Sequence, residues 1–302
     1  MFVILGATGN CGSVVAEALL KKREKVRVVG RSKERLETLV RLGAEGFIAD
    51  VTDARTLTKA FEGARAAYTL LPPNVAVTDV RGYQDRASSA IAEALEAAHV
   101  KHVVSLSSIG ADKESGTGPV VGLHKMEQRF NQIQGLNVLH IRAGYFMENT
   151  LPQAGLIRNL GMMAGPVRAD LPLPLIGTRD IGAFAADALL KLHFSGKQTR
   201  ELLGQRDISY AEMARIIGSA ISKKELSYQQ VPKEQVIQGM TQMGMSRNMA
   251  ELLCEMADAL NRGYMTALEP RSPANTTPTS FEAFVREVWL PAYQGKAASA
   301  QA

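Results

Sequence analysis

The first residues of this chain place a short apolar run directly before three regularly spaced glycines. Residues 2–5, Phe-Val-Ile-Leu, lead into Gly6, Gly9 and Gly12, and apolar residues then recur at helical spacing over residues 14–19. In such a strand–turn–helix unit the turn lacks side chains, and its backbone N–H groups lie at the positive end of the following helix. A pyrophosphate can approach those groups closely. The opening therefore predicts a β-α unit that binds a dinucleotide.

The end of the second apolar run, residues 26–29, carries basic residues where many dinucleotide sites have an acid. A site that prefers NAD usually holds an Asp or Glu about 20 residues beyond the glycines, where it accepts a hydrogen bond from the ribose 2′-hydroxyl. This chain has Arg31 there, followed by Ser32, Lys33 and Arg35. A guanidinium forms two charge-assisted hydrogen bonds with a phosphate. The sequence therefore predicts NADP(H) as the cofactor, preferred over NAD(H), with Arg31 as the main ligand of the 2′-phosphate.

Strand-like and helix-like segments alternate along the first half of the chain. Further apolar, strand-like runs occupy residues 45–50, 66–71, 102–106 and 137–141, and helix-like segments lie between them at residues 34–42, 54–62, 79–98 and 120–134. This rhythm is typical of parallel βαβ units, so we expect an α/β fold: a Rossmann-type, doubly wound parallel sheet with helices on both faces. Ligands of such sheets bind outside the carboxyl ends of the strands. The residues expected to rim the site are therefore 50–51, 70–73 and 105–108.

The character of the sequence changes near residue 150. Residues 151–174 are rich in Gly, Pro and Met and show no clean period, whereas residues 200–270 predict a short strand and several helices. A chain of 302 residues has room for two domains. We expect a Rossmann domain at residues 1–150 and a smaller, mostly helical substrate-binding lobe at residues 151–302, with a segment at about residues 173–195 returning to the first domain.

Charge and cysteine content argue against several classes of protein. Lys and Arg together number 35 and Asp and Glu 30, so the net charge of +5 is modest, and nucleic acid is not an expected partner. Neither the two cysteines, Cys11 and Cys254, nor the five histidines have metal-ligand spacing, so we expect no metal and no structural disulfide. No apolar run approaches the roughly 20 residues that span a bilayer, and no charged leader precedes Phe2. We therefore expect a cytoplasmic protein without a membrane segment.

Several short motifs, in this order and spacing, resemble the NmrA-like family of atypical short-chain dehydrogenases/reductases. They are the glycine pattern with Arg31, Leu-Leu-Pro-Pro at 70–73, Ser-Leu-Ser-Ser at 105–108, His-Lys-Met-Glu at 124–127, Arg-Ala-Gly-Tyr-Phe-Met-Glu-Asn at 142–149, residues 173–182, and Thr-Ser-Phe-Glu-Ala-Phe at 279–284. Together they extend over nearly the whole chain. The resemblance implies an NADP(H)-binding Rossmann domain followed by a smaller substrate domain.

The resemblance also implies a role for individual residues along the cofactor. The pyrophosphate would meet Gly6, Thr8, Gly9, Asn10, Cys11 and Gly12; the 2′-phosphate Arg31 and Lys33; the adenine Asp50 and Val51; the ribose and nicotinamide Leu71, Ser105, Leu106 and Ser107; and the nicotinamide and substrate Gly144, Tyr145 and Phe146. Asn149 is a further expected polar contact of the substrate at the mouth of the pocket.

One position departs from the pattern of ordinary short-chain dehydrogenases. These enzymes place a Tyr four residues before a Lys on one helix, so that the ammonium lowers the pKa of the phenol that exchanges a proton with the substrate. Here Val121 stands four residues before Lys125, and none of the seven tyrosines precedes a lysine at that spacing. We therefore do not expect tyrosine-based alcohol–ketone chemistry. Lys125 is expected to hold the nicotinamide ribose and to act as the catalytic residue by stabilising a developing anion.

Two functions from different classes are compatible with these motifs. The first is an NADPH-dependent reductase that transfers hydride to a quinone-like or other conjugated small molecule, since such an acceptor can take its proton from water and the cofactor carries the hydride chemistry. The second is a non-catalytic NADP(H) redox sensor that regulates a protein partner, a function that the missing tyrosine favours. We expect the reductase, because methionines at residues 240–256 together with Tyr145 and Phe146 could line a roomy substrate pocket, and we keep the sensor as the alternative. The sequence leaves open a homodimer.

Overall fold

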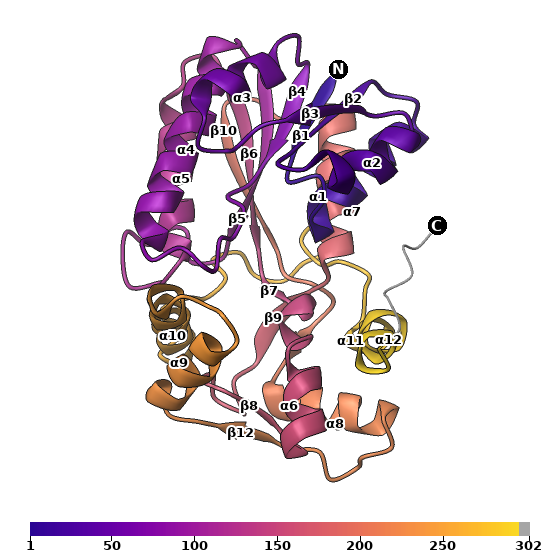
Figure 1. Ribbon diagram of the computed structural model, residues 1–302, viewed down its shortest axis with the longest axis vertical. Helices are drawn as coiled ribbons and strands as arrows, with labels where there is room; N and C mark the ends of the chain where they lie inside the picture. The colour runs from indigo at the N-terminus through magenta and orange to yellow at the C-terminus, as the bar shows by residue number, and fades with distance from the viewer. Residues whose placement is uncertain (296–302) are drawn as a thin grey trace.

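The computed structural model describes residues 1–295 and is built around a seven-stranded parallel sheet (Figure 1). The strands are β1 (Phe2–Leu5), β2 (Val26–Gly30), β3 (Glu45–Ile48), β4 (Ala66–Thr69), β5 (His102–Ser108), β6 (Asn137–Ala143) and β10 (Lys197–Leu202). Their order across the sheet is β10-β6-β5-β4-β1-β2-β3, and every neighbouring pair is parallel. The chain therefore extends from β1 in one direction and from β4 in the other. This doubly wound arrangement confirms the predicted Rossmann-type α/β fold.

Helices cover both faces of the sheet, so its central strands are buried on both sides. One layer contains α1 (Asn10–Lys21), α2 (Lys33–Arg41) and α7 (Thr178–Lys191), and the other contains α3 (Ala54–Phe61), α4 (Val80–Ala97) and α5 (Val120–Gln132). Polar side chains set several helix starts: Asp79, for example, begins α4 by accepting a hydrogen bond from the Gly82 N–H at 2.9 Å. This two-sided cover explains why the strands read as nearly continuous apolar runs in the sequence.

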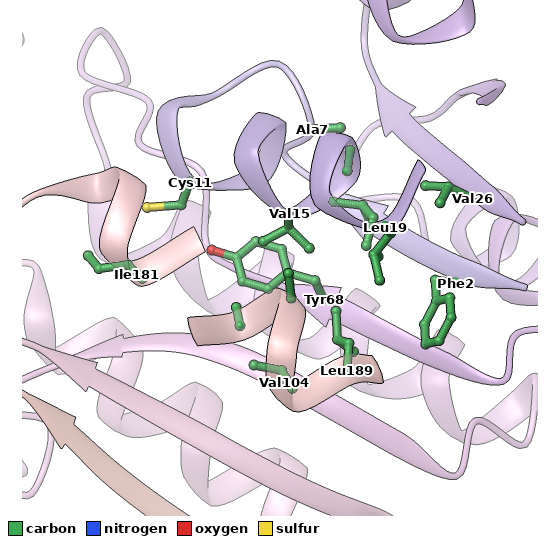
Figure 2. Packing of buried hydrophobic residues seen from close by; sticks show 14 of the residues in the cluster. Phe2, Ala7, Cys11, Val15, Leu19, Val26, Tyr68, Val104, Ile181 and Leu189 are labelled. Atoms are coloured by element: carbon green, nitrogen blue, oxygen red, sulfur yellow. The ribbon is translucent and has the colours of Figure 1, made fainter. Parts of the chain in front are cut away.

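Successive residues of β1 pack into opposite layers, as the pleat of a strand requires. Phe2 and Ile4 belong to the apolar core beneath α1 and α7, whereas Val3 and Leu5 belong to the core beneath α3, α4 and α5. Figure 2 shows the first of these cores, where Val15 of α1 and Leu189 of α7 meet Tyr68 of β4. α1, which begins directly after the glycine turn, is therefore packed firmly against the sheet.

The chain after β6 forms a mostly helical region with two small sheets, and it also contributes to the main sheet. Its further elements are β7 (Tyr145–Phe146), η1 (Met147–Thr150), α6 (Gln153–Leu160), β8 (Met163–Gly165), β9 (Leu173–Ile176), β11 (Asp207–Ile208), α8 (Tyr210–Ala220), β12 (Tyr228–Gln230), α9 (Lys233–Gln242), α10 (Arg247–Asn261), α11 (Phe281–Phe284), η2 (Val285–Trp289) and α12 (Leu290–Tyr293). The chain returns to the Rossmann sheet twice, through α7 against α1 and through β10 beside β6. Within residues 1–295 no helix has the length and apolar character needed to cross a bilayer.

Candidate functional site

A large cavity opens at the carboxyl ends of the central strands, between the sheet and the C-terminal region. Its volume is about 1080 Å³. Because the strands run in the order β2-β1-β4-β5-β6, the cavity wall follows that order: residues 29–32 and 35, the glycine turn, residues 70–73, residues 106–109, and residues 143–146 with 148 and 149. The cavity therefore spans the point where the strand order reverses, which is where doubly wound sheets bind their ligands.

The turn between β1 and α1 leaves no space for a side chain at two of its glycines. Gly6 has a φ of +62°, a left-handed conformation that other residues disfavour. A Cβ on Gly12 would lie 2.3 Å from the carbonyl oxygen of Gly6. At the start of α1, Gly9 provides no side-chain cap and the first turn contains no acid. The N–H groups at this positive helix end are thus available to an anion, so the residues present fit a pyrophosphate.

The remaining residues predicted at the pyrophosphate also line the cavity: Thr8, Asn10 and Cys11. Burial raises the pKa of the Cys11 thiol to about 12, and the nearby Glu148 carboxylate acts in the same direction. Cys11 therefore stays a neutral thiol, packed in the apolar core beneath α1 and α7 at the edge of the cavity.

The basic segment after β2 brings Arg31, Ser32 and Arg35 to the cavity wall, but not Lys33. Ser32 begins α2 by accepting a hydrogen bond from the Arg35 N–H at 3.3 Å. Residues two apart on a helix do not share a face, so Lys33 and Arg35 point in different directions. The structure therefore leaves Lys33 outside the cavity and supplies Arg35 as a second guanidinium beside Arg31.

After β3, the cavity is lined by Ala49 and Val51, and the predicted contact of Asp50 is corrected. The Asp50 carboxylate accepts hydrogen bonds from the Thr52 hydroxyl at 2.6 Å and from the Thr52 N–H at 2.8 Å. These bonds, and to a smaller extent the charge of Arg31, hold the pKa of Asp50 below its ordinary value. Asp50 thus closes its own turn, while the apolar Val51 offers a surface for an adenine ring.

At the ends of β4 and β5, Leu71, Leu106 and Ser107 line the cavity, but Ser105 does not. Ser105 lies one pleat further inside the sheet and is fully buried. Its Oγ is 2.7 Å from Nδ1 of His140, whose Nε2 lies 3.0 Å from the Asn131 side-chain oxygen. Ser105 therefore belongs to a hydrogen-bonded chain inside the protein and not to the site.

This buried chain predicts a loss of stability in mild acid. Burial lowers the pKa of His140 from 6.5 to about 4, so below pH 6.5 the unfolded chain binds a proton that the folded protein does not. Stability therefore falls as the pH is lowered from 6.5 towards 4, and we expect His140 to account for about 2 kcal/mol of the loss between pH 7 and pH 5. Urea denaturation at both pH values measures it. The His140→Gln variant should lose less stability than the wild type between these pH values, whereas His193→Gln, at an exposed histidine, should lose as much as the wild type. Equal pH dependence in the wild type and both variants would contradict the assignment.

The structure does not bring Lys125 to the cavity, which corrects its predicted role. Its side chain is 53% exposed, and Nζ lies 3.8 Å from the carboxylate of Asp85 on α4. The cavity-facing residues of α5 and its start are instead Pro119, Val120 and Leu123. Lys125 is two positions beyond Leu123, on a different face of the helix. It is therefore not positioned to hold the nicotinamide ribose or to stabilise an anion in the cavity.

The segment after β6 places Gly144, Tyr145, Phe146 and Asn149 on the cavity wall. The hydroxyl of Tyr145 lies 2.9 Å from that of Tyr210. Burial raises the pKa of Tyr145, and its hydrogen bonds to the Tyr210 and Asn149 side chains offset only part of that effect. Tyr145 is therefore a neutral, fixed part of the wall.

The wall opposite the sheet is apolar and comes largely from α10. Met249, Leu253 and Met256 of this helix line the cavity, together with Leu171 and Leu173. Of the methionines at residues 240–256, Met249 and Met256 line the cavity, whereas Met243 in the α9–α10 connection is 72% exposed. Thioether side chains adapt to ligands of different shape, so this wall suits a flat apolar molecule better than a sugar or a peptide.

Glu148 is a cavity residue that reasoning from the sequence missed. It lines the cavity, and its carboxylate accepts hydrogen bonds from the Thr178 N–H at 3.0 Å and from the Thr178 hydroxyl at 2.5 Å. Burial raises its pKa. Glu148 thereby holds the start of α7 against the site. Two sequence features could have indicated this role: Glu148 directly precedes Asn149, and Gly177-Thr178 is suited to the start of a helix.

The doubly wound sheet, the uncapped glycine turn and the two arginines define a Rossmann-type protein with a dinucleotide-sized cavity. The chain belongs to the NmrA-like family, which residues 1–285 match. It is 29% identical over 278 residues to an NAD(P)H azoreductase of Xenophilus azovorans, a match that covers 91% of this chain and 93% of the relative. It is 24% identical to Quinone oxidoreductase 2 of Escherichia coli, with 87% and 89% of the two chains covered.

Solved structures with the same fold carry the cofactor that the site fits. A quinone oxidoreductase of Escherichia coli in complex with NADPH superposes with a TM-score of 0.77 at 22% identity, over 88% of this chain and 91% of the other. A Citrobacter triphenylmethane reductase in complex with NADP(H) gives a TM-score of 0.78 at 20% identity, over 95% and 99%. At these identities the likeness establishes the fold. The distant relatives are NAD(P)H-dependent oxidoreductases.

Proposed function

We propose that this protein is an NADPH-dependent reductase that passes hydride to a quinone-like or other conjugated small-molecule acceptor. The observation that carries the proposal is that a single cavity joins the glycine turn and Arg31 to the apolar wall of α10. A cofactor site without adjoining space would serve a sensor, whereas this cavity, of about 1080 Å³, extends past the glycine turn and Arg31 to an apolar wall. The names of the relatives, an azoreductase and a quinone oxidoreductase, support acceptors with conjugated double bonds.

The residues of this chain would bind and orient the two reactants. The glycine turn and the start of α1 would hold the pyrophosphate, and Arg31 with Arg35 would hold the 2′-phosphate. When bound, NADPH supplies the hydride and the redox chemistry. Phe146 and the side chains of α10 would keep water away from the reacting atoms and stack an aromatic acceptor.

The polar groups at the site explain why a conjugated acceptor is preferred to a simple ketone. Reducing a ketone requires a donor that protonates or polarises the carbonyl oxygen. Neither a lysine nor a histidine is among the described residues lining the cavity. On α5, the helix that carries Lys125, the residues lining the cavity are the apolar Val120 and Leu123. A conjugated acceptor spreads the incoming charge over its own atoms and takes its proton from water. The site is therefore suited to acceptors that are electrophilic without assistance.

A panel of acceptors tests this proposal. Purified protein is mixed with NADPH and with quinones, azo dyes or enones, and the disappearance of the reduced nicotinamide absorbance is followed. We expect turnover well above the protein-free rate for at least one class, and its loss in Gly9→Asp, which puts a carboxylate at the phosphate turn. Gly239→Asp on α9, where a Cβ meets nothing within 4 Å, is the matched control and should retain activity.

A non-catalytic NADP(H) sensor is the second candidate function, and the lack of a lysine or histidine among the described residues of the cavity wall favours it. In that case the protein would bind NADPH tightly, turn over none of the acceptors, and signal the redox state to a protein partner. Tight binding without turnover across the whole panel would therefore decide for the sensor.

A further inference from the structure

A buried, charged cluster lies beside the cavity at the ends of β5 and β6, and the proposed reaction does not yet use it. Ser107 on β5 is in register with Arg142 on β6, and both contact Glu127 of α5. The Ser107 hydroxyl donates to Glu127 Oε1 at 2.5 Å. Arg142 binds the same carboxylate through two hydrogen bonds, of 3.0 Å from Nε and 2.6 Å from Nη2. Ser107 and Glu127 are each 2% exposed, and of these two only Ser107 lines the cavity.

The arrangement fixes the direction of the Ser107 hydroxyl. A carboxylate held by a two-pronged guanidinium is charged and can only accept hydrogen bonds. A serine hydroxyl has one proton, and here that proton is committed to Glu127. Only the lone pairs of Ser107 Oγ remain for a molecule in the cavity, so the group that meets Ser107 must itself be a hydrogen-bond donor.

A second buried acid, Glu201, adds negative charge near Arg142 and helps to keep the guanidinium charged. Glu201 on β10 is in register with Arg142 on its other side and is also 2% exposed. The Glu201 carboxylate accepts hydrogen bonds from the backbone N–H groups of Leu268 and Glu269, at 2.8 and 2.7 Å. Arg142 therefore stays charged and in place between two buried acids, and Glu127 keeps its partner.

We propose that Glu127 is a positioning residue that makes Ser107 a dedicated hydrogen-bond acceptor in the cavity, where it receives an O–H or N–H group of a bound ligand. This inference rests on the proposed function, because the ligands are taken to be NADPH and its acceptor. The donor group belongs either to the nicotinamide half of the cofactor, as a ribose hydroxyl or carboxamide N–H, or to the acceptor. Ser107 then cannot polarise a carbonyl by donating to it, which is a second reason for an acceptor that needs no such help.

Equilibrium binding distinguishes the two sources. Ser107→Ala removes the lone pairs and leaves the Glu127–Arg142 pair intact. If the donor is on the cofactor, the Kd for NADPH rises about fivefold, the usual cost of one neutral hydrogen bond. If it is on the acceptor, the NADPH Kd is unchanged. In that case, two quinones that differ only in one hydroxyl are titrated into the complex with NADP⁺. The ratio of their Kd values, which measures the preference for the hydroxyl, falls about fivefold in Ser107→Ala.

Two further variants separate this role from a general effect on the fold. Ser105→Ala is the matched control, since Ser105 is on the same strand but outside the cavity wall, with its Oγ 2.7 Å from Nδ1 of His140. It should change neither measurement. In Glu127→Gln, the amide N–H can donate to Ser107 and turn the serine proton into the cavity, so binding should weaken at least as much as in Ser107→Ala. Thermal melting checks that each variant is folded.

Unchanged binding of both ligands in Ser107→Ala, or equal losses in Ser105→Ala, would overturn the inference. All of these readouts are binding constants and do not require turnover. A wild-type protein that binds these ligands and reduces none would contradict the proposed function alone.

Discussion

Gly12→Ala is expected to abolish most NADPH binding, with a Kd at least about 100-fold higher than in the wild type, equivalent to ~2.7 kcal/mol. The added Cβ would lie 2.3 Å from the Gly6 oxygen and 2.7 Å from the Gly6 carbonyl carbon, and both are backbone atoms of the turn. The turn must therefore open, and the N–H groups at the start of α1 leave the positions from which they bind a pyrophosphate. Fluorescence titration of the reduced nicotinamide measures the Kd.

The matched control for this variant is Gly239→Ala, in the middle of α9. A Cβ at Gly239 meets nothing within 4 Å, and alanine favours a helix by about 1 kcal/mol over glycine. This variant should bind NADPH as the wild type does and melt no earlier. If Gly12→Ala is folded and still binds NADPH with wild-type affinity, the glycine turn is not the phosphate site.

Arg31→Ala is expected to raise the Kd for NADPH about 100-fold while changing the Kd for NADH little, because two charge-assisted hydrogen bonds of ~1.5 kcal/mol each are lost only when the 2′-phosphate is present. Arg31 lines the cavity at the end of β2, and Arg35 beside it keeps the remaining positive charge. Titration with both nucleotides gives the ratio of the two Kd values, which is the quantity that the prediction concerns.

Lys33→Ala provides the control for charge alone. It removes one positive charge two residues away from Arg31, at a side chain outside the cavity wall, so the NADPH Kd should change by less than about threefold at physiological salt. Equal losses of NADPH and NADH affinity in Arg31→Ala, or a larger effect of Lys33→Ala on the NADPH Kd, would show that Arg31 is not the ligand of the 2′-phosphate.

The fold was largely predictable because its signals are local in the sequence. The helix predicted at 79–98 is α4, Val80–Ala97, and the one predicted at 120–134 is α5, Val120–Gln132. Both start and stop within two residues of the predicted ends, since capping residues and apolar period act over a single turn. The glycine turn is local as well, and its close contact between Gly6 and Gly12 spans only six residues.

The individual site residues were harder to predict, because their positions depend on contacts between distant segments. Asp50 and Ser105 stand at the predicted strand ends, but Thr52 and His140 engage their side chains. Lys125 lies on the correct helix and on the wrong face, which only the packing of α5 against α4 decides. The role of Glu127 depends on Arg142, which is 15 residues away. Such pairings leave no periodic pattern in the sequence.

The measurement that tests the central claim most directly is a single turnover with NADPH deuterated at the nicotinamide C4. Two samples are compared, one labelled on each face of the ring, with an active quinone from the panel. Hydride transfer in a fixed geometry predicts that the acceptor-dependent loss of NADPH slows for one labelled face and not for the other. NADPH that binds to the protein but is oxidised no faster with quinones, azo dyes or enones than without them would contradict the account.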